Sequence, residues 1–281
     1  MDFPVQALPT VFSLTAVFCW GGSDFAGGFA SKKSDSFAVC LMVQASGFLL
    51  MLIAILVAHA PMPSWTSILW ALAAGAMGGT ALAIFYRALA NGSMGLTAPI
   101  AALVGAAIPT AYDLIAEGFP GLIPLAGFAL AAIGIWLIAR PDGEGGTSKG
   151  LGMALLAGVG FAGFMLCINR TGNSSALWSS LASRVSSMVI LTTVVTARSA
   201  WRLDGTGAWL GVLAGCLDVT GTAFFIRAGQ TGRLDSAVVI SSLYPAVTVL
   251  LARLLLREHF TRWKMAGILA ALAAVPLIAW Q

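Results

Sequence analysis

Charged residues are scarce in this chain of 281 residues, because only 9% are Asp, Glu, Lys or Arg while 59% are hydrophobic. A soluble domain carries about 25% charged residues, so this composition leaves too little polar surface and excludes a soluble enzyme. The first nine residues contain no Lys or Arg, whereas a cleavable signal peptide begins with a positively charged segment. We therefore expect the first apolar stretch to remain as a helix.

Clusters of metal-binding or catalytic residues are also missing from the sequence. The four cysteines lie singly in apolar segments without a Cys-x-x-Cys spacing, which predicts neither a disulfide framework nor a zinc site. His59 and His259 fall in separate turns and have no second histidine at metal-ligand spacing. Lys and Arg are scattered instead of forming a basic patch, so no nucleic-acid partner is predicted. We predict no enzymatic activity, no metal and no cofactor.

The sequence does contain a succession of apolar segments, each near the ~20 residues that a membrane-spanning helix needs. Gly, Pro, Asn and charged residues divide the chain into ten such segments. The predicted spans are 8–30, 36–58, 66–90, 95–116, 121–139, 150–170, 175–197, 206–229, 234–256 and 262–280. Only residues 140–149 have the composition of a flexible polar linker. We predict an all-α polytopic membrane protein with two units, 8–139 and 150–280.

The two predicted units resemble one another in sequence. The tetrapeptide FYRA at 85–88 returns as FIRA at 225–228, and an ungapped alignment of 85–140 with 225–280 has 14 identities in 56 positions. Composition alone would give about one match in ten, so an internal duplication is the best explanation. Because each unit has an odd number of spans, we predict inverted five-helix repeats with a substrate site at their interface.

Lys and Arg are distributed unequally between the two sides of the predicted bundle. Turns after odd-numbered spans hold 11 of these residues, whereas turns after even-numbered spans hold 3. Cytoplasmic loops carry the excess of positive charge in membrane proteins. We therefore predict a multi-pass protein of the cytoplasmic (inner) membrane with both termini on the non-cytoplasmic side.

Three charged residues, Asp24, Arg184 and Asp218, lie well inside predicted spans. Each charge costs about 2.5 to 3.5 kcal/mol at the centre of a spanning helix and therefore needs a partner or a function. Arg184 and Asp218 can form a buried ion pair, or one of them can meet a substrate charge or a coupled proton. Asp24 stands among four glycines and either binds a ligand there or reaches the interface near Lys32 and Lys33.

Aromatic residues inside the spans indicate a pocket for an amphipathic or cationic organic molecule, with helix packing as the alternative role. Proline residues in spans four and nine free backbone carbonyl groups, which places these spans beside a cavity. Asp113 and Arg253 occupy corresponding ends of two spans. They are candidate gate residues, or charges that simply lie among the lipid headgroups.

Several segments also carry a family resemblance: WGGS at 20–23, SSLYPAV at 241–247 followed by RE at 257–258, and the weaker counterpart APIAAL at 98–103. With these segments the whole chain resembles the EamA-type transporters of the drug/metabolite transporter (DMT) superfamily. The resemblance implies a ten-helix basket of two inverted repeats with a central cavity lined by helices 1, 3, 4, 6, 8 and 9. It also implies secondary transport, often export, of small organic solutes.

We predict a secondary active transporter that moves an amino acid, metabolite or drug-like compound by alternating access, with export and proton coupling as hypotheses. The alternative is a lipid or lipid-linked sugar flippase, or an importer of the same fold. The partners are the substrate and the lipid bilayer, with a monomer favoured. The candidate substrate-binding residues are Trp20, Ser23, Asp24, Tyr86, Pro99, Phe164, Ser241 and Tyr244. Asp24, Arg184 and Asp218 are the candidates for coupling or for a buried ion pair.

Overall fold

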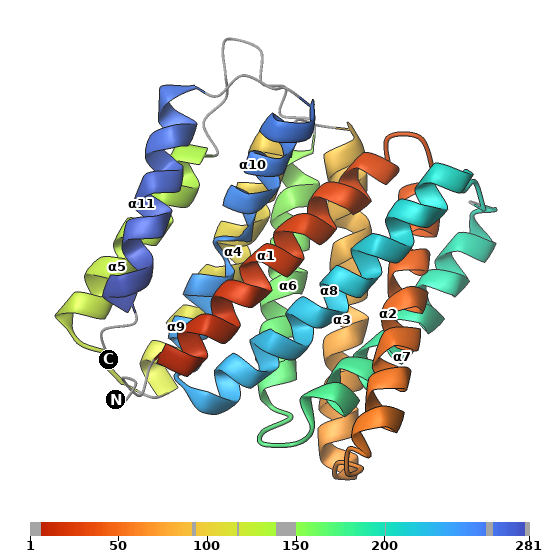
Figure 1. The fold of residues 1–281 in the computed structure, drawn as a ribbon, viewed down its shortest axis with the longest axis horizontal. Helices are drawn as coiled ribbons and strands as arrows, with labels where there is room; N and C mark the ends of the chain where they lie inside the picture. The colour runs from red at the N-terminus through yellow and green to blue at the C-terminus, as the bar shows by residue number, and fades with distance from the viewer. Residues whose placement is uncertain are drawn as a thin grey trace.

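Residues 7–91, 94–116, 118–138, 150–199, 201–256 and 261–278 are described by the computed structural model. Within these ranges the chain forms eleven α-helices and no strand (Figure 1). The helices are α1 (Ala7–Ala30), α2 (Ser36–Ala58), α3 (Trp65–Asn91), α4 (Met94–Ala116), α5 (Leu122–Ile138), α6 (Leu151–Asn169), α7 (Ala176–Ala197), α8 (Gly205–Thr231), α9 (Leu234–Ser241), α10 (Tyr244–Leu256) and α11 (Arg262–Ile278). The predicted linker at 140–149 lies outside the described residues.

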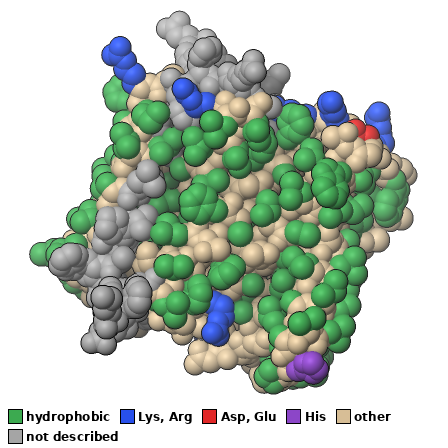
Figure 2. Space-filling view, in the orientation of Figure 1, with side chains coloured by type: hydrophobic (Ala, Val, Ile, Leu, Met, Phe, Trp, Pro, Cys, Tyr) green, Lys and Arg blue, Asp and Glu red, His purple; other side chains and the backbone are tan. Residues whose placement is uncertain are grey.

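The helices carry the apolar surface expected of a protein in a lipid bilayer. Six described segments are long and apolar enough to cross a membrane, and two shorter apolar helices accompany them. Large hydrophobic side chains face outward, as Phe18, Val57 and Leu254 do with at least 65% exposure. A broad hydrophobic belt separates the Lys and Arg side chains at one end from the opposite end (Figure 2). The chain is therefore a multi-pass integral membrane protein.

The segment predicted as one span at 234–256 is interrupted in the structure. Helix α9 ends at Ser241 and α10 begins at Tyr244. Pro245 has no amide hydrogen to continue the helical ladder, and the chain turns more tightly there, with Leu243 N donating to Ile240 O at 3.1 Å. Proline therefore divides this span into two helices without removing it from the bundle.

Helices from the two halves of the chain pack against one another in pairs. Helix α1 packs on α8 and α6 packs on α3, while α2 packs on α8 and α7 packs on α3. Helix α5 pairs with α11 along one side of the bundle, and α1 begins at the side where α11 ends (Figure 1). The core is thus built from contacts between residues far apart in the sequence.

Glycine allows the closest of these helix approaches. A Cβ atom on Gly75 of α3 would overlap the Ser183 carbonyl of α7, and one on Gly215 of α8 would overlap the Val43 carbonyl of α2. Small residues permit such backbone contact within membranes. Both members of the first contact are related to the second by a shift of 140 residues in the sequence.

Candidate functional site

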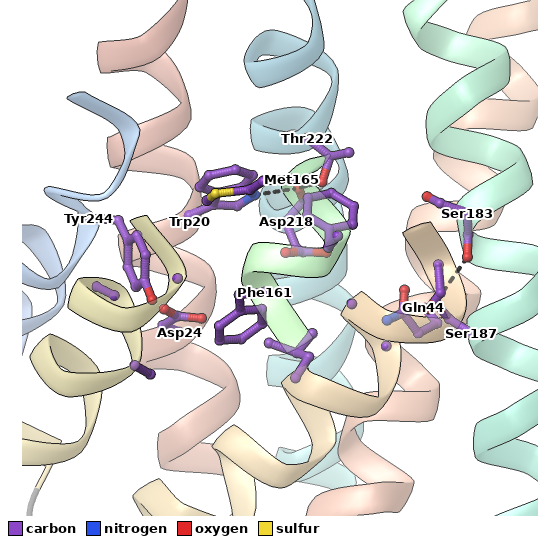
Figure 3. A pocket seen from close by; sticks show the side chains of 18 of the residues that line it. Trp20, Asp24, Gln44, Phe161, Met165, Ser183, Ser187, Asp218, Thr222 and Tyr244 are labelled. Carbon is purple, nitrogen blue, oxygen red and sulfur yellow. Dashed lines mark hydrogen bonds between the residues drawn. The ribbon is translucent and has the colours of Figure 1, made fainter. Parts of the chain in front are cut away.

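A cavity of about 660 Å³ lies between α1, α2, α3, α4, α6, α7, α8 and the break between α9 and α10 (Figure 3). Its lining residues are Trp20, Asp24, Gln44, Gly75, Gly78, Gly79, Leu82, Ala101, Ala102, Gly105, Phe161, Phe164, Met165, Ser183, Arg184, Ser187, Asp218, Thr222, Ser242 and Tyr244. The family resemblance implied six lining helices, and the structure adds α2 and α7. Several lining residues lie near the middle of long helices, so the cavity is deep in the bundle.

Arg184 of α7 and Asp218 of α8 meet in an ion pair, with 2.6 Å between Nη1 and Oδ2. Both residues are buried, at 5% and 9% exposure. The Asp218 Oδ2 atom lacks an aligned hydrogen bond despite this close approach. Arg184 also donates to Gln44 Oε1 at 2.6 Å and to Thr222 Oγ1 at 2.8 Å. The guanidinium group is therefore compensated by one carboxylate and two neutral acceptors, as a buried charge requires.

Asp24 of α1 is the third charged residue at the cavity. Only 6% of the residue is exposed. Within the described part of the chain no Lys or Arg forms an ion pair with Asp24. Figure 3 shows the Tyr244 hydroxyl and the Asp24 carboxylate directed toward one another. Asp24 is thus separate from the compensated pair formed by Arg184 and Asp218.

Trp20 forms a wall of the cavity and connects α1 to α8. Its indole Nε1 donates to the Asp218 carbonyl oxygen at 3.2 Å. Its ring packs on Phe225 at a centroid distance of 5.4 Å and meets Tyr244 edge-on at 6.3 Å. The indole has little room to move because Gly221 lies close beneath it. The aromatic wall is therefore held in place by hydrogen bonding and packing.

The other predicted binding residues occupy different positions. Phe164 lines the cavity, whereas Ser23, Tyr86 and Ser241 are buried beside it and are not among the lining residues. Ser23 Oγ and Tyr86 Oη lie 3.5 Å apart, in the contact between α1 and α3. The side chain of Pro99 lies outside the described part of the structure.

The two predicted gate residues have unlike surroundings. Asp113 is 2% exposed, and its Oδ2 accepts the Asp235 backbone N–H at 2.7 Å. The expectation of a headgroup charge is wrong for Asp113, because the start of α9 offers unpaired N–H groups that hold its carboxylate inside the protein. Arg253 is exposed near the end of α10.

Several cavity residues were missed by the sequence reasoning, most clearly Gln44. This amide lies in a helix whose mean hydropathy is 2.5, so the reasoning used for intramembrane charges would have selected it. Gln44 also stands 140 residues before Arg184, which is the offset of the sequence repeat. Phe161 and Met165 gave no comparable signal, because apolar residues on a spanning helix are as common on its lipid face as in a pocket.

Comparison with known proteins agrees with this architecture. Residues 148–280 match the model of the EamA-like transporter family. Among solved structures, 25 chains match. One of them, a crystal structure of a protein, is 14% identical and covers 97% of this chain and 98% of its own, with a TM-score of 0.75.

That likeness concerns the fold alone, because the identity is low. No curated protein matches the chain. The membrane-spanning helices and the match over residues 148–280 make this chain a member of the EamA-like transporter family, within the DMT superfamily.

Proposed function

We propose that this protein is a secondary transporter, not an enzyme, that exports a small organic solute through its cavity in exchange for protons. The observation that carries the proposal is the cavity itself, which combines carboxylates with an aromatic wall deep in the membrane bundle. Pockets that bind organic ligands are mostly apolar with a few directed polar groups. Membership in the EamA-like transporter family supports the same function.

Alternating access would come from ten spans in two inverted repeats, 8–139 and 150–280, with α9 and α10 together forming the ninth span. The helix contacts support this arrangement because they occur in matched sets. The contact of α1 with α10 has its counterpart in that of α6 with α4, just as α1 with α8 corresponds to α6 with α3. Inverted repeats can exchange conformations and so open a central site to each side in turn.

Within this mechanism Trp20, Asp24, Phe164 and Tyr244 would contact the solute. Asp24 would bind the coupled proton, since a carboxylate in a partly desolvated cavity and without an ion-pair partner can be neutralised in that way. Pro99 belongs to the same proposed site.

The buried residues beside the cavity would support it. Ser23, Tyr86 and Ser241 would keep the surrounding helices in register. Asp113 would close one end of the path through its contact with α9, and Arg253 would act at the other end. The protein would work as a monomer in the cytoplasmic membrane.

Transport by the purified chain in proteoliposomes tests this proposal. Amino acids, nucleobases and cationic dyes would be loaded in turn, and we expect at least one class to leave faster when a pH gradient is imposed. Asp24→Asn should abolish the gradient-driven flux while solute exchange between the two sides persists, and Cys216→Ser serves as the matched control. Gradient-driven flux that survives in Asp24→Asn would remove Asp24 as the proton carrier. Absence of flux for all three classes would contradict the proposed function.

A further inference from the structure

We infer that the solute bound in the cavity is a monovalent organic cation, which Asp24 binds in place of a proton. This inference rests on the proposed transport function and adds the charge of the substrate. The cavity lining holds three charged side chains, Asp24, Arg184 and Asp218. Two negative charges and one positive charge leave one net negative charge when all three are ionised. One positive charge, from a proton or a ligand, would neutralise the cavity.

Asp218 is not the acceptor, because its charge is already matched. Arg184 lies 2.6 Å from Asp218 and is held in place by Gln44 and Thr222. A ligand that took Asp218 would leave the Arg184 cation buried without its counterion, which is strongly unfavourable. The pair therefore behaves as a fixed, neutral wall, and the charge available to a ligand belongs to Asp24.

The groups that face Asp24 from the neighbouring helices provide no other cation. Asp218 of α8 acts on it electrostatically, and Asp24 in turn acts on Tyr86 of α3 and Tyr244 of α10. Arg184 of α7 is engaged as described. The described lining residues of α4 and α6 are Ala, Gly, Phe and Met, which do not titrate. An ionised Asp24 is therefore answered by hydroxyl groups alone until a ligand enters.

The rest of the lining favours an organic cation over a metal ion. A hard inorganic cation needs several oxygen ligands to replace its water, and no group of three metal-binding side chains occurs among the described residues. Trp20, Phe161, Phe164 and Tyr244 instead offer aromatic surface around the carboxylate. Aromatic faces attract ammonium groups, and they also accept the apolar body of such a ligand.

Binding to the purified full-length chain in detergent tests the charge of the ligand. Phenyltrimethylammonium would be compared by titration calorimetry with benzenesulfonate, of opposite charge, and with tert-butylbenzene, its neutral isostere. We expect the cation alone to bind, and its affinity to fall about tenfold for each pH unit once Asp24 is protonated. Heats measured in two buffers of different ionisation enthalpy should then show about one proton released for each cation bound.

Two variants separate the contribution of Asp24 from that of the pocket as a whole. Asp24→Asn should weaken cation binding by at least about tenfold and remove its dependence on pH, whereas Asp24→Glu should keep both. Cys216→Ser, outside the lining, is the control. If Asp24→Asn fails to fold, the proton release of the wild-type chain still decides.

The outcomes also separate this inference from the transport function. Equal binding of benzenesulfonate or tert-butylbenzene, or binding that is independent of pH, would overturn the assignment of a cation and leave transport standing. The same holds for a chain that moves a solute in proteoliposomes without binding phenyltrimethylammonium. Absence of both flux and binding would instead contradict the transport function itself.

Discussion

At the scale of single residues, the ion pair between Arg184 and Asp218 illustrates how a membrane interior tolerates charge. Each partner removes the need of the other for water, and Gln44 and Thr222 satisfy further donors of the guanidinium group. Removing one member of a buried pair leaves an uncompensated charge, whereas replacing both members by apolar residues is often harmless.

Stability measurements can therefore show whether the pair is a closed unit. Arg184→Met should lower the free energy of unfolding by about 3 to 5 kcal/mol, because Asp218 is left unpaired. Adding Asp218→Leu should recover most of that loss. Unfolding of the wild type, both single variants and the double variant in mixed micelles gives the coupling free energy. A double variant as unstable as Arg184→Met alone would contradict this account.

Outside the membrane-spanning segments, Asp204 joins the turn before α8 to the turn after α1. Its Oδ1 accepts Ser34 Oγ–H at 2.7 Å and Gly207 N–H at 2.7 Å. The Ser34 hydroxyl and then the Gly207 amide lower the pKa of Asp204 below its ordinary value. A lowered pKa in the folded state means that the stabilisation is complete above the ordinary pKa of about 4. It is lost as the pH falls through the lowered value.

Asp204→Asn should accordingly reduce the melting temperature in detergent at pH 7, because the ionised acceptor is lost. The difference between variant and wild type should shrink steadily below pH 4. Melting curves recorded between pH 7 and pH 2.5 measure it. A difference that is constant across this range would show that the charge of Asp204 is irrelevant to the contact.

At the scale of helices, the approach of α3 to α7 depends on the absence of a side chain at Gly75. Gly75→Ala should lower the free energy of unfolding by about 1 to 3 kcal/mol, since the added methyl group overlaps the Ser183 carbonyl. Gly152→Ala in α6 is the matched control, because a Cβ there meets nothing within 4 Å. Comparable losses in both variants would mean that helix propensity, not the contact, sets the effect.

Helix positions were predictable because the bilayer imposes a length on every apolar segment. The predicted ends agree within two residues with those of α1 to α8. The break after Ser241 was not predicted, since hydropathy measures side chains and does not register the hydrogen bond that Pro245 cannot donate. Likewise, Ser23 and Asp24 are adjacent in the sequence, yet only Asp24 lines the cavity. Which face of a helix turns inward depends on partners that the sequence alone does not place.

At the scale of the whole molecule, the duplication has diverged in charge more than in shape. Contacts such as those of Gly75 and Gly215 keep equivalent positions in the two halves. Gln44 and Arg184 are likewise 140 residues apart, yet one is neutral and the other is a cation, and they bind each other. The position 140 residues before Asp218 is Gly78, which also lines the cavity. A shared packing frame therefore holds a site whose charges come from single members of each pair.

The orientation of this frame in the membrane follows from the distribution of positive charge. The α1–α2 and α7–α8 turns carry exposed Lys and Arg residues, and Figure 2 shows such side chains gathered at one end of the molecule. Because positive loops remain in the cytoplasm, we expect Lys33→Cys to be shielded in intact cells and Asn173→Cys, in the α6–α7 turn, to react with an impermeant maleimide. Both would be introduced after Cys19, Cys40, Cys167 and Cys216 are replaced by Ala.

Cell lysis should make Lys33→Cys reactive as well, which shows that the thiol is exposed and was protected only by the membrane. Labelling of Lys33→Cys but not Asn173→Cys in intact cells would reverse the orientation. Labelling of both in intact cells would require these turns to share one side. The two inverted repeats could then not have the arrangement proposed here, because an odd number of crossings must separate the two turns.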